Sequence, residues 1–179
     1  MSTPAATVSP TLTVAYTAIV AFILSVTGLA DTQVIRGLQN RVAMPKPGFI
    51  VVQFLRQNRL RTNINRTGTA SPPSTATLEE AVELAFQIDC YGPQSHAWAT
   101  MLSTLLRDEY GVNALSPSGV TPLYADDAQL MPFIDGESQY EARWRLDARF
   151  QMNLITTIPQ QYADALELTL VDIQQRFPA

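Results

Sequence analysis

The sequence predicts an α/β (α+β) fold in a single domain, with a mostly antiparallel sheet, a central helix packed on it and an N-terminal helix. Residues 81–91 and 140–154 alternate between apolar and polar positions, which is typical of strands that bury one face. Residues 93–110 change to helical spacing, and residues 11–29 form an uncharged stretch of helix type. A chain of 179 residues can bury enough surface to fold without a disulfide or a metal.

The composition indicates a surface that partners cover in part. Hydrophobic residues make up 46% of the chain, and charged residues make up 16%, against about 25% in typical domains. The net charge of −4 argues against general affinity for nucleic acid. Cys90, the only cysteine, falls on the apolar side of a predicted strand and is expected to be a buried thiol. The lack of a disulfide framework fits assembly in a reducing cytoplasm.

Residues 1–30 are expected to form an N-terminal arm and helix, in which residues 1–10 are the loose arm. Residues 11–29 carry no charge, which raises the question of a membrane span. No Lys or Arg precedes the stretch, so we favour a helix buried by its own sheet and by a neighbouring subunit. Its apolar stripe is Val14, Ala18, Ile19, Phe22, Val26 and Leu29.

The next segments predict a connector, a strand and a projecting hairpin. Residues 31–48 form the connector, and residues 49–55 are an apolar run of strand type. Antiparallel pairing of residues 49–55 with 81–91 would make residues 56–78 the tip of a projecting hairpin loop. Loops of this length are usually functional or disordered, so the segment is either a docking element or a solvated connector. It carries four arginines, Arg56, Arg59, Arg61 and Arg66.

Gly92 and Pro93 end the 81–91 strand, and the helix that follows is expected to stop near Tyr110 and Gly111. The helical stripe is Trp98, Met101, Leu102, Leu105 and Leu106. We expect one core between sheet and helix, built from Leu84, Phe86, Ile88, Trp98, Leu102, Leu105, Trp144, Leu146 and Phe150.

The second long strand is unusual for its length. Residues 111–137 lead to it as a connector with short extended pieces near 122–124 and 129–133. A strand over 140–154 would span roughly 45–50 Å, whereas most strands have about 3–10 residues. It should therefore bend at a bulge or extend onto a neighbour, and Pro159 should end it. For the tail, residues 160–177, both strand and helix patterns are present, and we favour a strand.

Charged residues occupy one face of this long strand. Arg143, Arg145 and Arg149 alternate along it with Glu141 and Asp147 between them. One interpretation is cross-strand ion pairing on a solvated face. The other is a charged surface that faces a neighbouring subunit or a lumen.

The sequence contains no recognisable catalytic or metal-binding motif. The acidic pairs Asp126-Asp127 and Asp135 with Glu137 lack the spacing of a calcium loop. The single histidine, His96, is expected on a helix surface rather than beside a nucleophile. There is no phosphate-binding glycine loop, no Cys/His metal spacing and no nucleophile elbow. We therefore expect no catalytic residue, no metal and no cofactor.

Four stretches resemble a known family: MPKPGFIVV at 44–52, NRLRTN at 58–63, FQIDCYGP at 86–93 and PFIDGESQYEARW at 132–144. Over residues 31–173 the chain resembles the tail-terminator proteins of tailed bacteriophages, in particular the neck-terminator family. The resemblance implies an α/β fold with a mostly antiparallel sheet and a helix across it. It also implies a sixfold ring that caps the finished tail tube, meets the neck of the capsid and has no catalytic site.

The resemblance implies a set of partners: other copies in a homohexameric ring, the tail tube protein and head–tail connector proteins of the neck. The sheath protein is a further candidate, DNA would only pass through the lumen, and no membrane is involved. The protein would assemble in the host cytoplasm and reside in the tail and neck of the virion. The candidate interface residues are Arg56, Arg59, Arg61, Arg66, Arg143, Arg145 and Arg149. Alternatives are another neck, tail-completion or connector protein, or a small ligand-binding or enzymatic domain.

Overall fold

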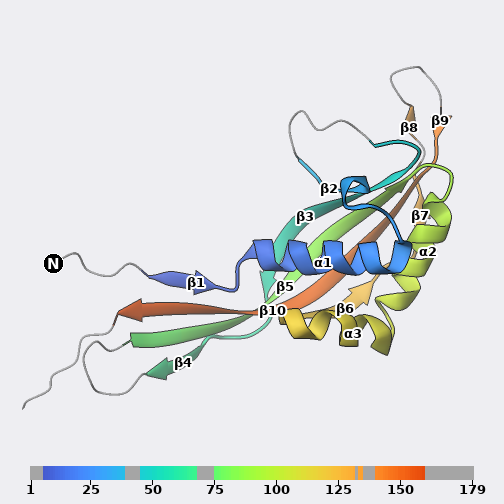
Figure 1. Ribbon diagram of the computed structural model, residues 1–179. Coiled ribbons are helices and arrows are strands. Elements are labelled where there is room, and N and C mark those ends of the chain that lie inside the picture. Colours follow the sequence, from blue (N-terminus) through green and yellow to red (C-terminus); the bar gives the residue numbers. More distant parts are fainter. Residues whose placement is uncertain (1–5, 39–44, 68–74, 132, 135–139, 160–179) are drawn as a thin grey trace, which may run out of the picture.

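The chain folds as helices packed on one strongly twisted sheet, the α+β architecture that the sequence predicts (Figure 1). The computed structural model describes residues 6–38, 45–67, 75–131, 133–134 and 140–159. The helices within these ranges are α1 (Leu12–Thr27), α2 (Ser95–Leu105) and α3 (Glu109–Leu115), with 3₁₀ turns at Asp31–Gln33 and Ser116–Ser118. The strands are β1 (Thr7–Ser9), β2 (Val34–Arg36), β3 (Phe49–Arg59), β4 (Ile64–Thr67), β5 (Thr75–Tyr91), β6 (Val120–Ala125), β7 (Gln129–Leu130), β8 (Phe133–Ile134), β9 (Tyr140–Glu141) and β10 (Arg143–Pro159).

Strands β5 and β10 form the centre of the sheet and pair antiparallel over their whole 17-residue lengths. The strand order in the described part of the chain is β1-β10-β5-β3-β2. Strand β4 also pairs with β5, β6 and β7 pair with β10, and β8 and β9 form a separate hairpin. Only β2 and β3, among the described pairs, run parallel. The predicted mostly antiparallel sheet is therefore confirmed.

The three helices lie on one face of the sheet and enclose the core with it (Figure 1). The alternating residues of β5 that were predicted to face the core are all buried there: Val82, Leu84, Phe86, Ile88 and Cys90. Helix α1 crosses β3 and β5, where the Tyr16 hydroxyl accepts a 2.8 Å hydrogen bond from the Phe54 N–H. The Tyr16 ring also packs edge-on against Phe86, with centroids 5.1 Å apart. This contact ties the N-terminal helix to the middle of the sheet.

The predicted core is confirmed. Most of its members belong to one buried cluster: Leu84, Phe86, Ile88, Trp98, Leu102, Leu146 and Phe150. Leu105 and Trp144 are partly buried and pack against it. Helix α1 adds apolar side chains to the same cluster, namely Ala15, Ala18, Ile19, Phe22 and Ile23. Because these side chains come from sheet and helices together, the described part of the chain shares one core.

The prediction of one helix over residues 93–110 is wrong. Helix α2 ends at Leu105, and α3 starts after Asp108, whose carboxylate accepts a 2.9 Å hydrogen bond from the Tyr110 N–H. Gly111 is part of α3 instead of a helix stop, and a Cβ there would lie 2.5 Å from the Leu105 carbonyl oxygen. The apolar spacing continues across the break, so periodicity alone misses the capping carboxylate. Met101, expected on the apolar stripe of the helix, is 39% exposed, because the buried face of α2 runs through Trp98, Ala99 and Leu102.

The N-terminal prediction needs two corrections. Residues 7–9 are not loose, because β1 pairs with residues 155–157 at the edge of β10. Val14 is 38% exposed, whereas the neighbouring Ala15 is fully buried, so the apolar stripe of α1 is rotated from the expected one. No helix within the described ranges is both long and apolar enough to cross a membrane.

Three predicted strands are longer than expected, and the connectors contain structure. Strand β3 continues to Arg59, and β5 begins at Thr75. Strand β10 ends at Pro159 as predicted and stays paired with β5 throughout, so it extends past the helices without breaking (Figure 1). The predicted connectors hold β2, α3 and β6, because β2 pairs with β3, β6 pairs with β10, and α3 packs against α1. The predicted tail strand at 160–177 lies outside the described residues.

Candidate interaction surface

Strands β5 and β10 project beyond the helices as a ribbon (Figure 1). We call this part the distal ribbon and define it as β1, β4, residues 75–80 and residues 153–159. Every described residue in it is exposed or half-buried. Its exposed apolar side chains are Val8, Ile64 and Ile155, which are 51%, 37% and 42% exposed. The distal ribbon therefore offers apolar side chains and backbone to a partner while adding little to the core of its own chain.

Three of the predicted interface arginines pair with glutamates on the distal ribbon. Arg59 contacts Glu80 at 2.7 Å, and Arg61 contacts Glu79 at 2.8 Å. Arg66, on β4, also approaches Glu79, at 3.6 Å. Arg59 and Arg66 are more than half exposed, so water screens these pairs and each contributes little stability. The pairs leave the ribbon nearly neutral along this edge.

The segment over residues 56–78 is more ordered than the loop that the sequence suggested. Residues 56–59 continue β3, and residues 64–67 form β4 against residues 76–79 of β5. Residues 68–74 lie outside the described part. Backbone pairing to β5 explains the difference, because a polar composition does not prevent a segment from adding to an existing strand edge.

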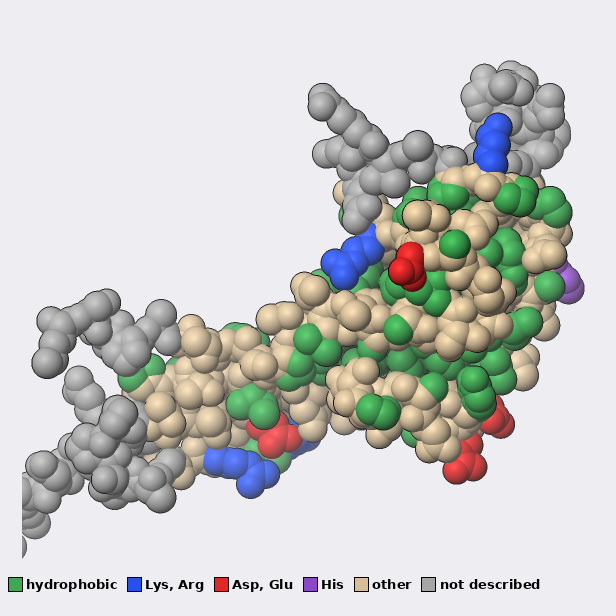
Figure 2. All heavy atoms as spheres, viewed as in Figure 1, with side chains coloured by type: hydrophobic (Ala, Val, Ile, Leu, Met, Phe, Trp, Pro, Cys, Tyr) green, Lys and Arg blue, Asp and Glu red, His purple; other side chains and the backbone are tan. Residues whose placement is uncertain are grey.

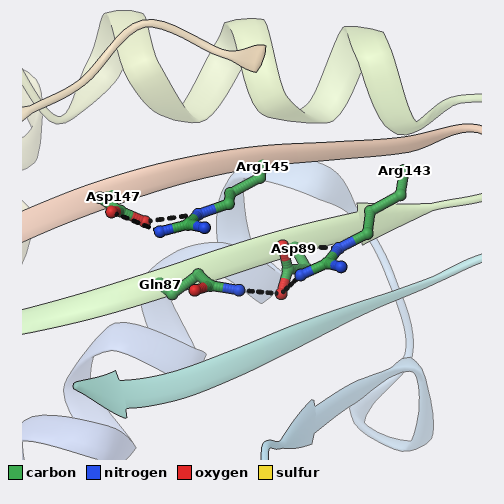
Figure 3. Close-up of polar contacts among 5 residues, drawn as sticks. All are labelled: Gln87, Asp89, Arg143, Arg145 and Asp147. Carbon is green, nitrogen blue, oxygen red and sulfur yellow. Dashed lines mark hydrogen bonds and ion pairs between the residues drawn. The ribbon is translucent and has the colours of Figure 1, made fainter. Parts of the chain in front are cut away.

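A second group of charges lies on the sheet face opposite the helices. We call it the polar face; it consists of Ala85, Gln87, Asp89, Tyr91, Arg143, Arg145, Asp147 and Arg149. Arg143 donates to both oxygens of Asp89, at 3.0 and 2.9 Å (Figure 3). The Gln87 amide donates to the same carboxylate at 2.6 Å. The Asp89 side chain is only 4% exposed, so this pair replaces the water that a buried carboxylate would otherwise need.

Arg145 makes a similar two-pronged contact along its own strand. Its guanidinium donates to both oxygens of Asp147, at 3.0 and 2.8 Å (Figure 3). Both partners are about one-third exposed, so this pair is weaker than the one at Asp89. Hydrogen bonding to their carboxylates raises the pKa of Arg143 and of Arg145, which keeps both side chains charged.

The interpretation of cross-strand ion pairing holds for one of the three β10 arginines. Arg143 pairs across to β5, Arg145 pairs within β10, and the side chain of Glu141 lies outside the described part. The face is not simply solvated, since Gln87 and Asp89 are buried. Asp89, the partner of Arg143, was not among the predicted site residues. It alternates onto the polar side of β5, where Arg145 stands opposite it and Arg143 reaches it diagonally.

Arg56 and Arg149 differ from the other predicted arginines. The side chain of neither forms a hydrogen bond or an ion pair with any other residue that the structure describes. Both stand opposite Ala85 in the sheet register, one on each side of β5. They line one hollow together, with Leu55, Ala85, Asp147 and Ala148.

The remaining candidate groups do not assemble into a reactive centre. Cys90 is fully buried, and burial together with the neighbouring Asp89 charge raises the pKa of its thiol to about 12. His96 is on the exposed side of α2, beside the Trp144 ring at 4.4 Å. Asp127 pairs with Arg107 at 2.8 Å, and the predicted pair of Asp135 and Glu137 lies outside the described residues.

The fold and this surface define an α+β protein whose central strands extend beyond its core. The sequence matches the family described as phage neck terminator protein over residues 14–175. The chain therefore belongs to the phage neck terminator family, which confirms the resemblance and extends it into α1. It is a structural protein of the bacteriophage virion that is located in the neck and interacts with other phage tail or head proteins; such proteins are not typically enzymes. No curated protein matches the sequence.

Proposed function

We propose that the protein caps the phage tail tube and joins it to the head–neck connector as a closed ring of identical subunits, a homohexamer. The observation that carries this proposal is the distal ribbon. Strands β5 and β10 keep pairing there although no described side chain between residues 153 and 159 is buried. Strands β1 and β4 add to its edges, but a sheet without a buried hydrophobic face is marginally stable by itself, so a stretch of this length is best explained by contact with a neighbour.

Contact with a neighbouring copy would cover apolar surface that the isolated chain leaves in water. Val8, Ile64 and Ile155 lie on three different strands of the ribbon. Each Å² of apolar surface removed from water contributes about 25 cal/mol. Strands β1 and β4 cover only short parts of the ribbon edges, so backbone donors and acceptors are also available to another strand.

The helical face supports the same proposal. Helix α1 contains no charged residue, and Figure 2 shows a face of the body on which charged side chains are few. An interface between subunits is poor in charge at its centre, whereas a free surface is usually rich in it. In a ring, the distal ribbon of one subunit would lie on the body of the next. Such a head-to-tail contact generates a closed ring when the rotation that relates neighbouring subunits divides a full turn evenly.

The other proposed partners follow from the position in the neck. The tail tube protein would contact one side of the ring and the connector the other, with the sheath protein as a further candidate. DNA would pass through the lumen, and assembly would take place in the host cytoplasm. Arg59, Arg61 and Arg66 pair with glutamates of the distal ribbon. We assign these three arginines to the contact with the tube or a neck protein. Arg143 and Arg145 would hold the charged side chains of the polar face in place through their ion pairs with Asp89 and Asp147.

The test is complementation of a phage that lacks a functional copy, with electron microscopy of its tails. Ile64→Asp with Ile155→Asp places charges on the distal ribbon. The matched control is Leu123→Asp with Leu130→Asp on β6 and β7, because it adds the same two charges at positions that are 44% and 52% exposed and lie outside both the ribbon and the helices. The ribbon variant should fold and yet produce tails without a terminal ring, whereas the control should retain the ring.

Two results would contradict the proposal. The first is a wild-type virion in which this subunit is absent from the tail end or present in a number that sixfold symmetry forbids. The second is an equal loss of rings in the ribbon variant and the control, which would remove the special role of the distal ribbon.

A further inference from the structure

The row of residues that contains Arg56, Ala85 and Arg149 lies on the polar face of the body, between the Asp89 ion pair and the distal ribbon. Arg56 of β3 and Arg149 of β10 both stand opposite Ala85 of β5. Neighbouring strands are about 4.8 Å apart, so the two arginine backbones are roughly 10 Å from each other. The small alanine between them leaves open the space above β5 that a longer side chain would fill.

A β-bulge brings Arg56 into this row. Phe54 pairs with Phe86 and Arg56 with Ala85, so Leu55 is an extra residue in β3. Strict alternation from Phe54, which faces the core, would place Arg56 on the helix side. The bulge returns it to the polar face, and re-aiming a side chain is a common role of bulges. Strand β6 shifts its register against β10 at Arg149 as well, so both flanks of the row are irregular.

The hollow at this row combines uncompensated positive charge with apolar walls. Its volume is about 200 Å³, and Leu55, Ala85 and Ala148 form its apolar lining. Asp147 also lines it, but both oxygens of that carboxylate already accept hydrogen bonds from Arg145. The guanidinium groups of Arg56 and Arg149 therefore have no carboxylate partner among the described residues.

We propose that Arg56 and Arg149 form a carboxylate-binding cleft that receives a glutamate or aspartate from an extended acidic segment of a partner protein. A guanidinium presents paired donors that match the two oxygens of a carboxylate, and two of them can hold one group from both sides. The apolar lining accommodates the methylene groups of an acidic side chain. The proposal deepens the neck-joining function above and rests on it for the identity of the partner as another virion protein.

The surroundings favour a protein carboxylate over a nucleic-acid backbone. Asp147 stands beside the cleft, and Glu83, the next residue of β5 on this face, is also acidic. A phosphate chain running across the face would meet these charges, and the protein as a whole has a net charge of −4. A single side chain that enters between the two arginines avoids that repulsion.

The test uses the ¹⁵N-labelled full chain and the arginine Nε–Hε signals in NMR spectra. The probe is the peptide acetyl-(Glu-Thr)₃-amide, and its glutamine analogue serves as the uncharged comparison. The Arg56 and Arg149 signals, identified by their loss in single Gln variants, should shift saturably with the glutamate peptide. The glutamine peptide should bind at least about tenfold more weakly, because charge-assisted hydrogen bonds are lost.

The matched variants separate the cleft from general charge. Arg56→Gln with Arg149→Gln should abolish the peptide effect, whereas Arg36→Gln with Arg107→Gln removes the same charge from arginines outside the polar face and the distal ribbon and should keep it. Circular dichroism confirms that both variants fold. An absent shift, equal shifts with both peptides or equal losses in both variants would overturn the cleft. Tighter binding of a duplex DNA 12-mer would overturn it in favour of nucleic acid. Since the measurement needs no ring, loss of the ring in the tail experiment leaves its result unaffected.

Discussion

The two halves of the β5–β10 pair have the same backbone pairing and opposite environments. In the body, β5 buries nearly every side chain from Ala81 to Cys90, and Phe86 and Phe150 are fully buried. In the distal ribbon the same two strands bury no described side chain. Backbone hydrogen bonds extend a strand beyond its core, but only packing on a second layer makes it stable. The ribbon therefore depends for its stability on the packed segments of β5 and β10 in the body, from which its two central strands continue.

This difference separates what the chain needs in order to fold from what it offers to its neighbours. Substitutions in the body should change the free energy of unfolding, and substitutions in the ribbon should change assembly. Four substitutions test the comparison, from the largest expected change in the free energy of unfolding to the smallest.

The largest effect is expected for Phe86→Ala in the body. Phe86 is fully buried and packs against Tyr16, Phe54 and Phe150. Its removal leaves a cavity between α1 and the sheet, which should lower the free energy of unfolding by about 3–5 kcal/mol. Urea denaturation of the purified chain measures this. A loss below about 1 kcal/mol would mean that the sheet and α1 do not form one core.

Arg143→Met should have the next largest effect. It keeps much of the side-chain volume but leaves the Asp89 carboxylate with the Gln87 amide as its described side-chain donor. We expect a loss of about 2–3 kcal/mol, because a buried charge without its partner is costly. Arg145→Met is the control: Asp147 is partly exposed, so water can replace the arginine and the loss should stay below about 1 kcal/mol. Equal losses would show that burial of Asp89 is not the cause.

Ile155→Ala tests the distal ribbon. The side chain is 42% exposed and has no core to leave, so its removal should cost about 1 kcal/mol or less. In the virion the same change removes apolar surface from the proposed subunit contact, so the yield of infectious particles should fall. Thermal unfolding and plaque counts, taken together, check both parts. Strong destabilisation with a normal yield would reverse the proposed division between body and ribbon.

Arg59→Gln should have the smallest effect. The ion pair with Glu80 is exposed to water, and such pairs contribute about 0.2–1 kcal/mol. The difference from wild type should disappear in about 1 M salt, where the screening length is near 3 Å. A difference that persists in high salt would mean that Arg59 stabilises the ribbon through packing of its stem instead of its charge.

Much of the architecture could be predicted from local patterns. Alternation along residues 82–90 identified the core face of β5, and the uncharged run before Gly28 identified α1. The break between α2 and α3 could not be found by spacing, because the apolar period continues through Asp108. Strands β1, β2 and β4 are only three or four residues long, and each is stabilised by the strand that it pairs with.

The seven candidate arginines were identified as charged positions, but the sequence did not distinguish their roles. The register places Arg145 opposite Asp89, yet Arg143, opposite Tyr91, reaches that carboxylate diagonally across 54 positions of sequence, whereas Arg145 pairs with Asp147. A bulge at Leu55 decided that Arg56 joins Arg149 on one face. Neither feature leaves a local signature, because both depend on how two distant strands align.

The sequence by itself determined the buried faces of β5 and β10, because alternation expresses the burial of apolar side chains against neighbours that any fold must supply. The tertiary structure alone decided which half of β5 and β10 enters the core, which carboxylate each arginine meets and which arginines remain without one. Those outcomes depend on the three helices covering only part of the sheet (Figure 1). Burial and charge pairing are properties of contacts between residues far apart in the chain, and only the folded arrangement brings those residues together.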